Sequence, residues 1–365
     1  MFLSRPTPSQ QHNIQPAVNF HYQSTIKPIT TVNIPTISPK STYTSIPSKM
    51  VSLKEATAAN EALKHTQTSM TAVFIGATAG IGLSTLKTLA RSIDRPHAIM
   101  VGRSATAFFP QLEALRSSNP NATFDFIESD ISLLANVDSA SSSIKQLLKD
   151  GEKIDFLFQS QGYVSFAGRE TNADGLDNSI SLRYYGRVRF EQNLLPLLSS
   201  SARLVSVLGG GKEGKIIEDD LDLERNYSIT ASAAQFGSFM TLSHDHLAGL
   251  PENSGRTFTH VFPGLVKTGL LGRSAKGVLG GFLRWVVEPL LGLFSLNVQE
   301  VGERMLYYST SEQFAKGSLS LDWDGRVTDE KVVAEYRANG WAQKVWEHNE
   351  KMFARALGHD ERVEK

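Results

Sequence analysis

Three glycines at a fixed spacing give the first chemical signal in the chain. Gly76, Gly80 and Gly82 follow the apolar run 72–75 and precede a helical stretch over 83–91. This strand, turn and helix start is the form that a nucleotide diphosphate site takes in a doubly wound sheet. The glycines permit a sharp turn, close approach of the backbone to phosphates and close packing of helix on strand. Free N–H groups at the helix start then face the anion. A plain tight turn is the alternative.

The next strand ends in a basic residue that bears on the choice of cofactor. An apolar run over 97–101 is followed by Gly102, Arg103 and Ser104. In dinucleotide-binding folds the end of this strand meets the adenosine ribose, where an acid bonds the 2′-hydroxyl and an arginine accommodates a 2′-phosphate. Because Arg103 has no acid beside it in the sequence, the pattern favours NADP over NAD. A solvated surface arginine is the alternative.

A parallel sheet would bring these residues to one edge, and the spacing of the apolar segments predicts one. We expect strands over 72–75, 97–101, 123–127, 154–158, 202–208 and 318–323, and helices over 52–65, 83–91, 109–118, 181–195, 298–310 and 328–357, with two more ending near 150 and 250. This alternation is typical of an α/β, Rossmann-type doubly wound parallel sheet.

Composition narrows the classes of function. The chain has 365 residues, 41% of them hydrophobic, with 37 basic and 37 acidic side chains. A net charge near zero gives no reason to propose a nucleic-acid partner. The absence of cysteine excludes disulfides, thiolate metal sites and a cysteine nucleophile. His244 and His246 stand two apart on a predicted helix and do not share a face, so no metal site is expected.

The first 50 residues differ from the rest. They are rich in proline, serine and threonine, and no aspartate or glutamate occurs before Glu55. Such a stretch cannot bury enough apolar surface to offset its ordering entropy, so we expect a disordered leader over 1–50. A transit peptide over 1–49, which would make the protein mitochondrial rather than cytoplasmic, and a true start at Met50 are the alternatives. No secretory signal is expected, because 1–11 lacks a long apolar core.

The order of these motifs resembles the short-chain dehydrogenase/reductase family. The spacing Gly76-x3-Gly80-x-Gly82 is similar to its cofactor turn, and Asp130–Ile131 resembles the pair that contacts adenine. Gly162 closes the turn after the fourth strand. The stretch 263–268 resembles the Pro-Gly segment near the nicotinamide carboxamide.

The resemblance spans about 70–270 and implies one Rossmann domain over 51–365, with a C-terminal helical extension. Cofactor and substrate would share one edge of the sheet. A further likeness to filamentous-fungal members, often found in natural-product biosynthesis, lies in 205–214. The cofactor-binding residues that the resemblance implies are Gly76, Thr78, Gly80, Ile81, Gly82, Arg103, Asp130, Ile131, Gly162, Pro263, Val266 and Thr268.

Catalysis in the resembled family uses a tyrosine with a lysine four residues on, a serine and an asparagine. The tyrosine acts as acid and base because the neighbouring cation lowers the pKa of its phenol. Tyr227 is the best candidate in this chain, but its fourth following residue is Ala231. Arg183 stands at the asparagine position and Gly209 at the serine position. A purely structural Tyr227 is the alternative.

Other residues could supply the missing groups. Ser206 lies three residues before Gly209, and strand alternation would aim its hydroxyl at the same place only through a local bulge. A hydrogen-bonded strand serine is the alternative. Arg183, Lys212 and Lys215 are candidate cations, each of which could instead be solvated.

The segment 269–297 corresponds to the variable flap over the substrate in the resembled family. Its apolar part, 278–294, indicates a hydrophobic substrate, packing in the core or between copies of the chain, or peripheral contact with a membrane surface. A spanning helix is not expected, because Arg284 and Glu288 interrupt the run and Pro289 breaks it.

Together these features predict an NADP-dependent oxidoreductase that reduces a carbonyl or oxidises an alcohol of a hydrophobic small molecule, in secondary-metabolite biosynthesis. A homo-oligomer is a further expectation. The alternative is a protein of the same fold that binds NADP without redox catalysis, as a sensor, a scaffold or an isomerase-like enzyme. The departures at Gly209 and Ala231 favour that alternative.

Overall fold

The computed structural model describes residues 50–267, 295–315, 317–328 and 331–358. Several of the features predicted above lie outside the described residues. These are the leader over 1–49, Thr268 and the flap as far as residue 294, including the whole apolar part 278–294.

Seven strands form one sheet in the order β3-β2-β1-β4-β5-β6-β7, and every neighbouring pair is parallel. The strands are β1 (Ser69–Ile75), β2 (Arg95–Gly102), β3 (Thr123–Glu128), β4 (Ile154–Gln159), β5 (Leu198–Val207), β6 (Thr257–Val261) and β7 (Gly317–Leu321). The strand order reverses between β1 and β4. Ligands of open parallel sheets bind at such a point, outside the carboxyl ends of the strands.

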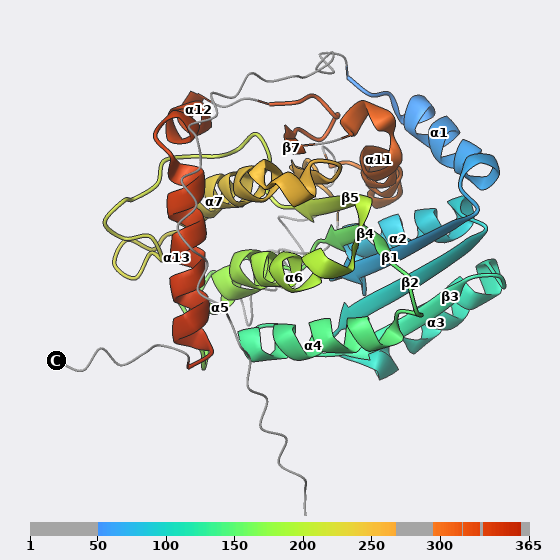
Figure 1. Ribbon diagram of the computed structural model, residues 1–365, viewed down its shortest axis with the longest axis horizontal. Coiled ribbons are helices and arrows are strands. Elements are labelled where there is room, and N and C mark those ends of the chain that lie inside the picture. The colour runs from blue at the N-terminus through green and yellow to red at the C-terminus, as the bar shows by residue number, and fades with distance from the viewer. Residues whose placement is uncertain (1–49, 268–294, 316, 329–330, 359–365) are drawn as a thin grey trace, which may run out of the picture. The chain divides into compact units, whose positions relative to one another are not determined.

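Helices cover both faces of this sheet (Figure 1). One layer consists of α1 (Leu53–Thr66), α2 (Gly80–Ser92), α3 (Ala105–Ser118) and α11 (Val298–Thr310). The other consists of α4 (Leu134–Leu147), α6 (Gly186–Leu194), α7 (Ile229–Gly249), α12 (Lys331–Ala338) and α13 (Trp341–Ala356). The fold class predicted from the sequence, a Rossmann-type doubly wound sheet with C-terminal helices, is therefore confirmed.

The inner strands β1, β2 and β4 are buried on both faces, which explains why their sequences read as largely continuous apolar runs. On the α2 and α11 side, Phe156 packs against Phe74 and Phe158 with ring centroids 5.6 and 5.7 Å apart. On the other side, Phe236 and Phe239 of α7 pack at 5.2 Å. Two apolar cores thus fix the helices to the sheet.

Several elements differ from their predicted bounds, and three of the differences bear on the site. Strand β5 begins at Leu198, four residues earlier than expected. Helix α3 begins at Ala105 rather than 109, because Ser104 caps it by accepting a hydrogen bond from the Ala107 N–H at 3.1 Å. The helix predicted over 181–195 is interrupted: a short α5 (Asn178–Ile180) leads into a π-helical turn, η1 (Ser181–Tyr185), before α6.

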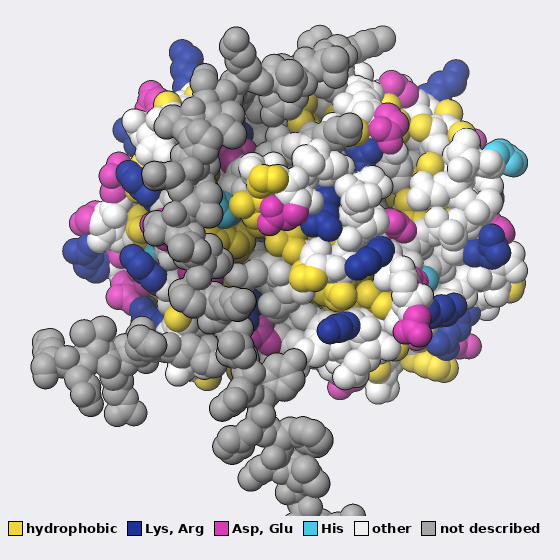
Figure 2. Space-filling view, in the orientation of Figure 1, with side chains coloured by type: hydrophobic (Ala, Val, Ile, Leu, Met, Phe, Trp, Pro, Cys, Tyr) yellow, Lys and Arg dark blue, Asp and Glu magenta, His cyan; other side chains and the backbone are white. Residues whose placement is uncertain are grey.

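The C-terminal helix α13 packs on α7 (Figure 1). Its contacts reach buried tyrosines of η1: the Tyr184 hydroxyl donates to Asn349 Oδ1 at 2.9 Å, and the Tyr185 hydroxyl lies 2.9 Å from His348 Nε2. Basic and acidic side chains are interspersed on the described surface that Figure 2 shows. Among the described residues, no helix has the length and apolarity that crossing a membrane requires.

Candidate active site

The turn after β1 packs directly on the turn after β4. Gly76 has a positive φ of 86°, and a Cβ there would lie 2.5 Å from the backbone nitrogen of Gln161. A Cβ on Gly82 would lie 2.5 Å from Ser160 Oγ. The Ser160 N–H donates to the Ile75 carbonyl at 2.9 Å. The close approach of two backbone segments therefore requires glycine at position 76, and the Ser160 side chain and the Gly76 carbonyl crowd position 82, as the spacing suggests.

The start of α2 offers backbone donors to a ligand. Its N-cap is Ala79, whose side chain makes no capping hydrogen bond, and Gly80 has a φ of 60°. Thr78 is exposed in the turn and Ile81 is half-buried. The first N–H groups of the helix consequently lack a side-chain acceptor, which a pyrophosphate could supply. The cradle of glycines and the uncapped helix start fit the diphosphate of a dinucleotide.

The ends of β2 and β3 lie side by side next to this turn. A Cβ on Gly102 would lie 2.6 Å from Thr78 Cγ2, so the β1 turn also packs on β2. Arg103 and Asp130 are exposed, while Ile131 is buried in the core. These predicted adenosine contacts thus reach one edge of the sheet.

An acid that the sequence analysis missed also reaches the end of β2. Glu128 ends β3, and its Oε2 accepts a hydrogen bond from the Ala105 N–H at 2.8 Å, at the start of α3. The parallel register pairs Gly102 with Glu128, which is what brings the carboxylate there. The position of Glu128 depends on the register between β2 and β3, which no sequence motif indicates.

Arg183 lies next to the turn after β4. A Cβ on Gly162 would lie 3.3 Å from Arg183 Cβ. The guanidinium donates a hydrogen bond to Ser232 Oγ in the first turn of α7. Burial lowers the pKa of Arg183, and the charges of Tyr227, Asp177 and Tyr163 oppose that shift. The arginine at the family's asparagine position therefore bridges β4 and α7 at the carboxyl edge of the sheet.

Tyr227 is half-buried and stands just before α7, whose N-cap Ser228 accepts a hydrogen bond from the Ala231 N–H at 3.0 Å. Burial and then the Asp177 charge raise the pKa of Tyr227, whereas Arg183 acts to lower it. Arg183 is thus the cation that influences this phenol, in the absence of a lysine four residues on.

The two lysines considered as replacement cations lie elsewhere. Lys212 Nζ lies 3.4 Å from Asp322 Oδ2 and 5.1 Å from the centre of the Phe262 ring. Lys215 is exposed. Neither is among the charges that shift the pKa of Tyr227.

Ser206 does not reach the edge of the sheet. Its side chain is completely buried, and its hydroxyl donates to Glu191 Oε1 at 3.2 Å and lies 3.4 Å from Gln159 Nε2. The pairing of β5 with β6 is regular from Arg203 to Val207, so the bulge that a catalytic role would need is absent there. The proposed replacement of the missing serine is corrected accordingly: this hydroxyl belongs to the interior.

A buried charged network surrounds Ser206. Glu191 accepts hydrogen bonds from Gln159 Nε2 at 2.8 Å and lies 3.1 Å from His244 Nε2. Arg187, also fully buried, donates to the carbonyl oxygens of Gln159, Gln161 and Val207 at 3.2, 2.5 and 2.9 Å. Burial lowers the pKa of Arg187 to about 9. The signal for this network was a glutamate and an arginine on the core-facing side of a predicted helix, which the sequence analysis left unused.

A second network fixes the loop after β5. Glu213 Oε1 accepts hydrogen bonds from Thr241 and Ser320, both at 2.6 Å, and lies 3.4 Å from His260 Nδ1. His260 Nε2 accepts from the Gly209 N–H at 2.8 Å. Burial raises the pKa of Glu213, but these hydrogen bonds and the His260 charge outweigh it and hold the pKa well below its usual value. The glycine at the family's serine position is thereby anchored through its backbone.

The segment after β6 turns back toward the edge of the sheet. Gly264 has a φ of 81°, and Pro263 and Val266 are half-buried. Val266 forms a parallel bridge with Leu296, and the Leu296 N–H donates to the Leu265 carbonyl at 2.7 Å. The two ends of the segment 267–295 are therefore held together, next to the predicted nicotinamide contacts.

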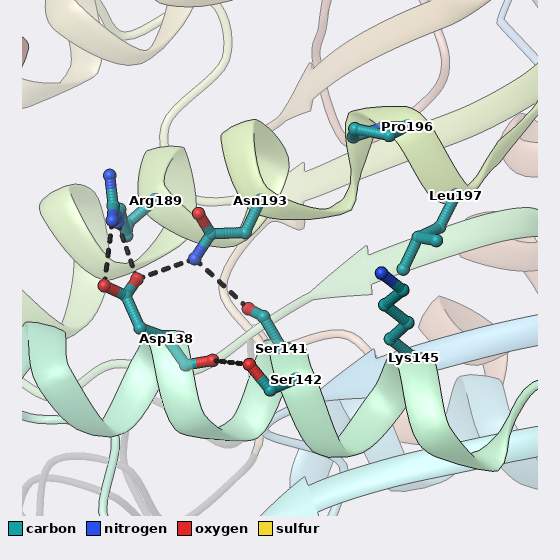
Figure 3. Close-up of a pocket in the computed structure, with 8 residues that line it drawn as sticks. All are labelled: Asp138, Ser141, Ser142, Lys145, Arg189, Asn193, Pro196 and Leu197. Atoms are coloured by element: carbon teal, nitrogen blue, oxygen red, sulfur yellow. Dashed lines mark hydrogen bonds and ion pairs between the residues drawn. The ribbon is translucent and has the colours of Figure 1, made fainter. Parts of the chain in front are cut away.

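A hollow of about 320 Å³ lies away from this edge, between α4 and α6 (Figure 3). Arg189 and Asn193 of α6 both bond Asp138 of α4 across it, and Lys145 lines its other end. Arg189 and Asn193 already pair with Asp138, and none of the lining residues belongs to the predicted site. Among the described residues, no group of three histidines or acids could hold a metal ion.

Comparison with known proteins supports the assignment of the fold. No family model matches the chain. An oxidoreductase of Emericella nidulans is 37% identical over 337 residues, which cover 84% of this chain and 99% of the relative. The oxidoreductase andH of Emericella variicolor is 33% identical, with 86% and 99% covered. The short-chain dehydrogenase/reductase SAT2 of Stachybotrys chartarum is 29% identical, with 68% and 75% covered.

Solved structures share the fold. A short-chain dehydrogenase/reductase from Serratia marcescens is similar with a TM-score of 0.52 and 17% identity, over 70% of this chain and 97% of the other. The actinorhodin polyketide ketoreductase with NADPH is similar with a TM-score of 0.50 and 19% identity, over 67% and 92%.

Proposed function

This chain belongs to the short-chain dehydrogenase/reductase family, and on that premise we propose that it is an NADP-dependent oxidoreductase that reduces a carbonyl of a hydrophobic small molecule. The observation that carries the proposal is the arrangement at one sheet edge. The glycine turn of β1, the Gly162 turn of β4 and the Arg183–Ser232 contact meet at the point where strand order reverses.

Each part of the dinucleotide has candidate partners along this edge. The backbone of 76–82 would hold the diphosphate, Arg103 the 2′-phosphate, and Asp130 with Ile131 the adenine. Gly162, Pro263 and Val266 would flank the nicotinamide, with Thr268 as a further expected contact. A bound NADPH supplies a hydride. The similar ketoreductase carries NADPH, which supports NADP here.

The protonation state of Tyr227 fits the role of a proton donor. Because burial and Asp177 raise the pKa of its phenol, Tyr227 keeps its proton at neutral pH. A neutral phenol can donate a proton to a carbonyl oxygen, whereas alcohol oxidation needs a base. Tyr227 is therefore proposed as the proton donor of a carbonyl reduction, and Arg183 stabilises the phenolate left behind.

Binding of NADP without redox catalysis is the second candidate function. It is favoured by Ala231 in place of a lysine, by Gly209 in place of a serine, and by a Ser206 hydroxyl that is engaged in the interior. A sensor, a scaffold or an isomerase-like enzyme would need the cofactor turn but not the proton donor.

The pathway, the location in the cell and the partners of the protein are also proposals. We propose a role in secondary-metabolite biosynthesis and a cytoplasmic location, or a mitochondrial one if 1–49 acts as a transit peptide. Homo-oligomers and peripheral membrane contact through 278–294 are further proposals, and a substrate lid over 269–297 is another.

Two measurements separate the candidate functions. NADPH binding is followed by its fluorescence, and NADPH oxidation is followed against a panel of apolar ketones. Wild type is expected to bind and turn over, and Tyr227→Phe to bind equally but lose most of its turnover, about 100-fold or more. Tyr336→Phe, which removes a half-buried phenol that accepts from the Ile216 N–H at 2.7 Å, is the matched control.

Each result has a distinct meaning. Absence of NADPH binding contradicts the glycine-turn interpretation. Binding without turnover on any ketone favours the second candidate. Turnover that survives Tyr227→Phe removes Tyr227 from the mechanism.

A further inference from the structure

Arg183 carries a positive charge that its contacts do not neutralise. Its guanidinium donates to the neutral hydroxyl of Ser232, and its Nε is shielded from solvent without a hydrogen-bond partner in the described part of the chain. Arg189, one turn and a half further on, instead pairs with Asp138 at 2.7 Å. A shielded cation without a carboxylate is electrostatically prepared for an anion.

The π-helical turn explains where this charge lies. Tyr184 and Tyr185 are consecutive, yet both are completely buried and pack toward α13. Arg183 lies against Gly162 and reaches Ser232 on α7. A π turn within an α-helix is rare and is frequent at functional sites. It keeps the two tyrosines in the core while the arginine reaches the edge of the sheet.

Two phenols accompany the guanidinium. Tyr163 and Tyr227 both act electrostatically on Arg183 and on each other. Burial raises the pKa of both phenols, so both keep their protons at neutral pH. The Tyr163 oxygen accepts a hydrogen bond from Asn178 Nδ2 at 3.0 Å, which leaves its own proton for another acceptor.

Two acids, Asp177 and Glu170, act on these phenols, and Asp177 is committed to the backbone. Asp177 Oδ1 accepts from the Ile180 N–H and Oδ2 from the Glu170 N–H, both at 2.9 Å. This carboxylate is almost fully buried, where it caps α5. It lowers the net charge felt at Arg183 but does not occupy the donors of the guanidinium.

We propose that Arg183 binds an anionic oxygen of the substrate in the form of a carboxylate. A planar guanidinium matches a carboxylate in both charge and hydrogen-bonding geometry. The inference rests on the proposed function for the location of the substrate, and it narrows the substrate to an apolar molecule with an acidic oxygen.

Binding of hexanoate and hexanamide tests this proposal without any turnover. The two probes share chain length and shape and differ in charge. Calorimetric titrations are made into the full-length protein, alone and with NADPH, whose reduced nicotinamide ring is neutral and so does not itself attract a carboxylate. Hexanoate is expected to bind about tenfold or more tightly than hexanamide, in line with one charge-assisted contact.

Three variants assign the preference to the arginine. Arg183→Gln is expected to abolish the preference for hexanoate while leaving NADPH affinity unchanged, and Arg183→Lys to keep part of it. Ser232→Ala removes the neutral partner but keeps the charge, so it should retain the preference. Urea unfolding of each variant checks that it is folded, and Arg183→Lys decides the question if Arg183→Gln does not fold.

The proposal is overturned if wild type binds both probes equally or binds neither, or if Arg183→Gln keeps the preference. A loss of NADPH affinity in Arg183→Gln with an unchanged preference also overturns it, since the arginine would then serve the cofactor. Failure of the proposed function is a separate result: the preference for hexanoate persists, but no ketone is reduced.

Discussion

The two halves of the carboxyl edge of the sheet are built from different material. At the ends of β1 and β2, neighbouring backbone and side-chain atoms lie within 2.6 Å of where a Cβ would stand on Gly76, Gly82 or Gly102, and polar side chains such as Arg103 are exposed. At the ends of β4, β5 and β6, two networks of buried charged side chains centred on Glu191 and Glu213 lie beneath the edge.

In the first half, backbone geometry dictates the residue type. In the second half, different side chains can serve at the same position. A turn that needs glycine accepts no other residue without strain. The glycine spacing of a cofactor turn can therefore be recognised in the sequence. A side-chain network can exchange one hydrogen-bonding group for another while the strands stay in place. The residues that the sequence analysis assigns to the family's catalytic positions, Arg183, Gly209 and Ala231, belong to the second half.

The largest effect is expected where the first half is tightest. Gly76→Ala places a Cβ 2.5 Å from the Gln161 nitrogen at a positive φ, so the variant should lose about 3 kcal/mol of unfolding free energy and most of its NADPH binding. Gly151→Ala is the matched control: its φ is also positive, at 76°, but nothing lies within 4 Å, so it should lose only about 1 kcal/mol. Equal losses in urea unfolding would contradict the close-approach argument.

In the second half, Glu213→Gln should lower the unfolding free energy by about 3 kcal/mol at pH 7, because a buried, hydrogen-bonded charge is replaced by an amide that faces two hydroxyl donors. The folded pKa lies below the unfolded value, so the stabilisation is present above about pH 4.5 and is lost as pH falls through the folded pKa. The difference in unfolding free energy between wild type and Glu213→Gln should therefore become smaller at acidic pH.

Urea unfolding between neutral pH and acid measures this narrowing. Exposed Glu218 lies five residues away, and Glu218→Gln serves as control with almost no expected effect. A gap that stays constant with pH would remove the charge of Glu213 from the explanation.

The sequence predicts the first half of the carboxyl edge better than the second. The spacing of Gly76, Gly80 and Gly82 reports backbone geometry directly, and the apolar runs report strands buried on both faces, so the fold and the turns emerged correctly. The location of Ser206 could not be predicted, because its partner Glu191 lies on another element. The position of the Arg183 side chain depends on the π-helical turn η1, which the hydrophobic periodicity of the sequence does not reveal.

His348 extends the comparison to the helix that supports the second half. Burial lowers its pKa to about 4, and its Nε2 lies 2.9 Å from the Tyr185 hydroxyl. The unfolded chain therefore takes up a proton first as pH falls, and stability should decline by about 2 kcal/mol between pH 6.5 and 4. His348→Gln should flatten this part of the urea-unfolding profile, whereas His65→Gln, on the exposed surface of α1, should not. An unchanged slope in His348→Gln would assign the acid sensitivity elsewhere.

The smallest effect is expected for an exposed side chain in the first half. Arg103→Ala should weaken NADPH binding about tenfold, roughly 1.4 kcal/mol, because a solvated guanidinium contributes only a screened contact to a 2′-phosphate. NADH binding should not change. Arg95→Ala, at the opposite end of β2, is the control of equal charge. Equal weakening of NADPH and NADH would mean that Arg103 supports the turn and not the phosphate. A selective loss of NADPH binding would show that the exposed Arg103 determines the choice of cofactor, although backbone geometry determines the rest of the first half.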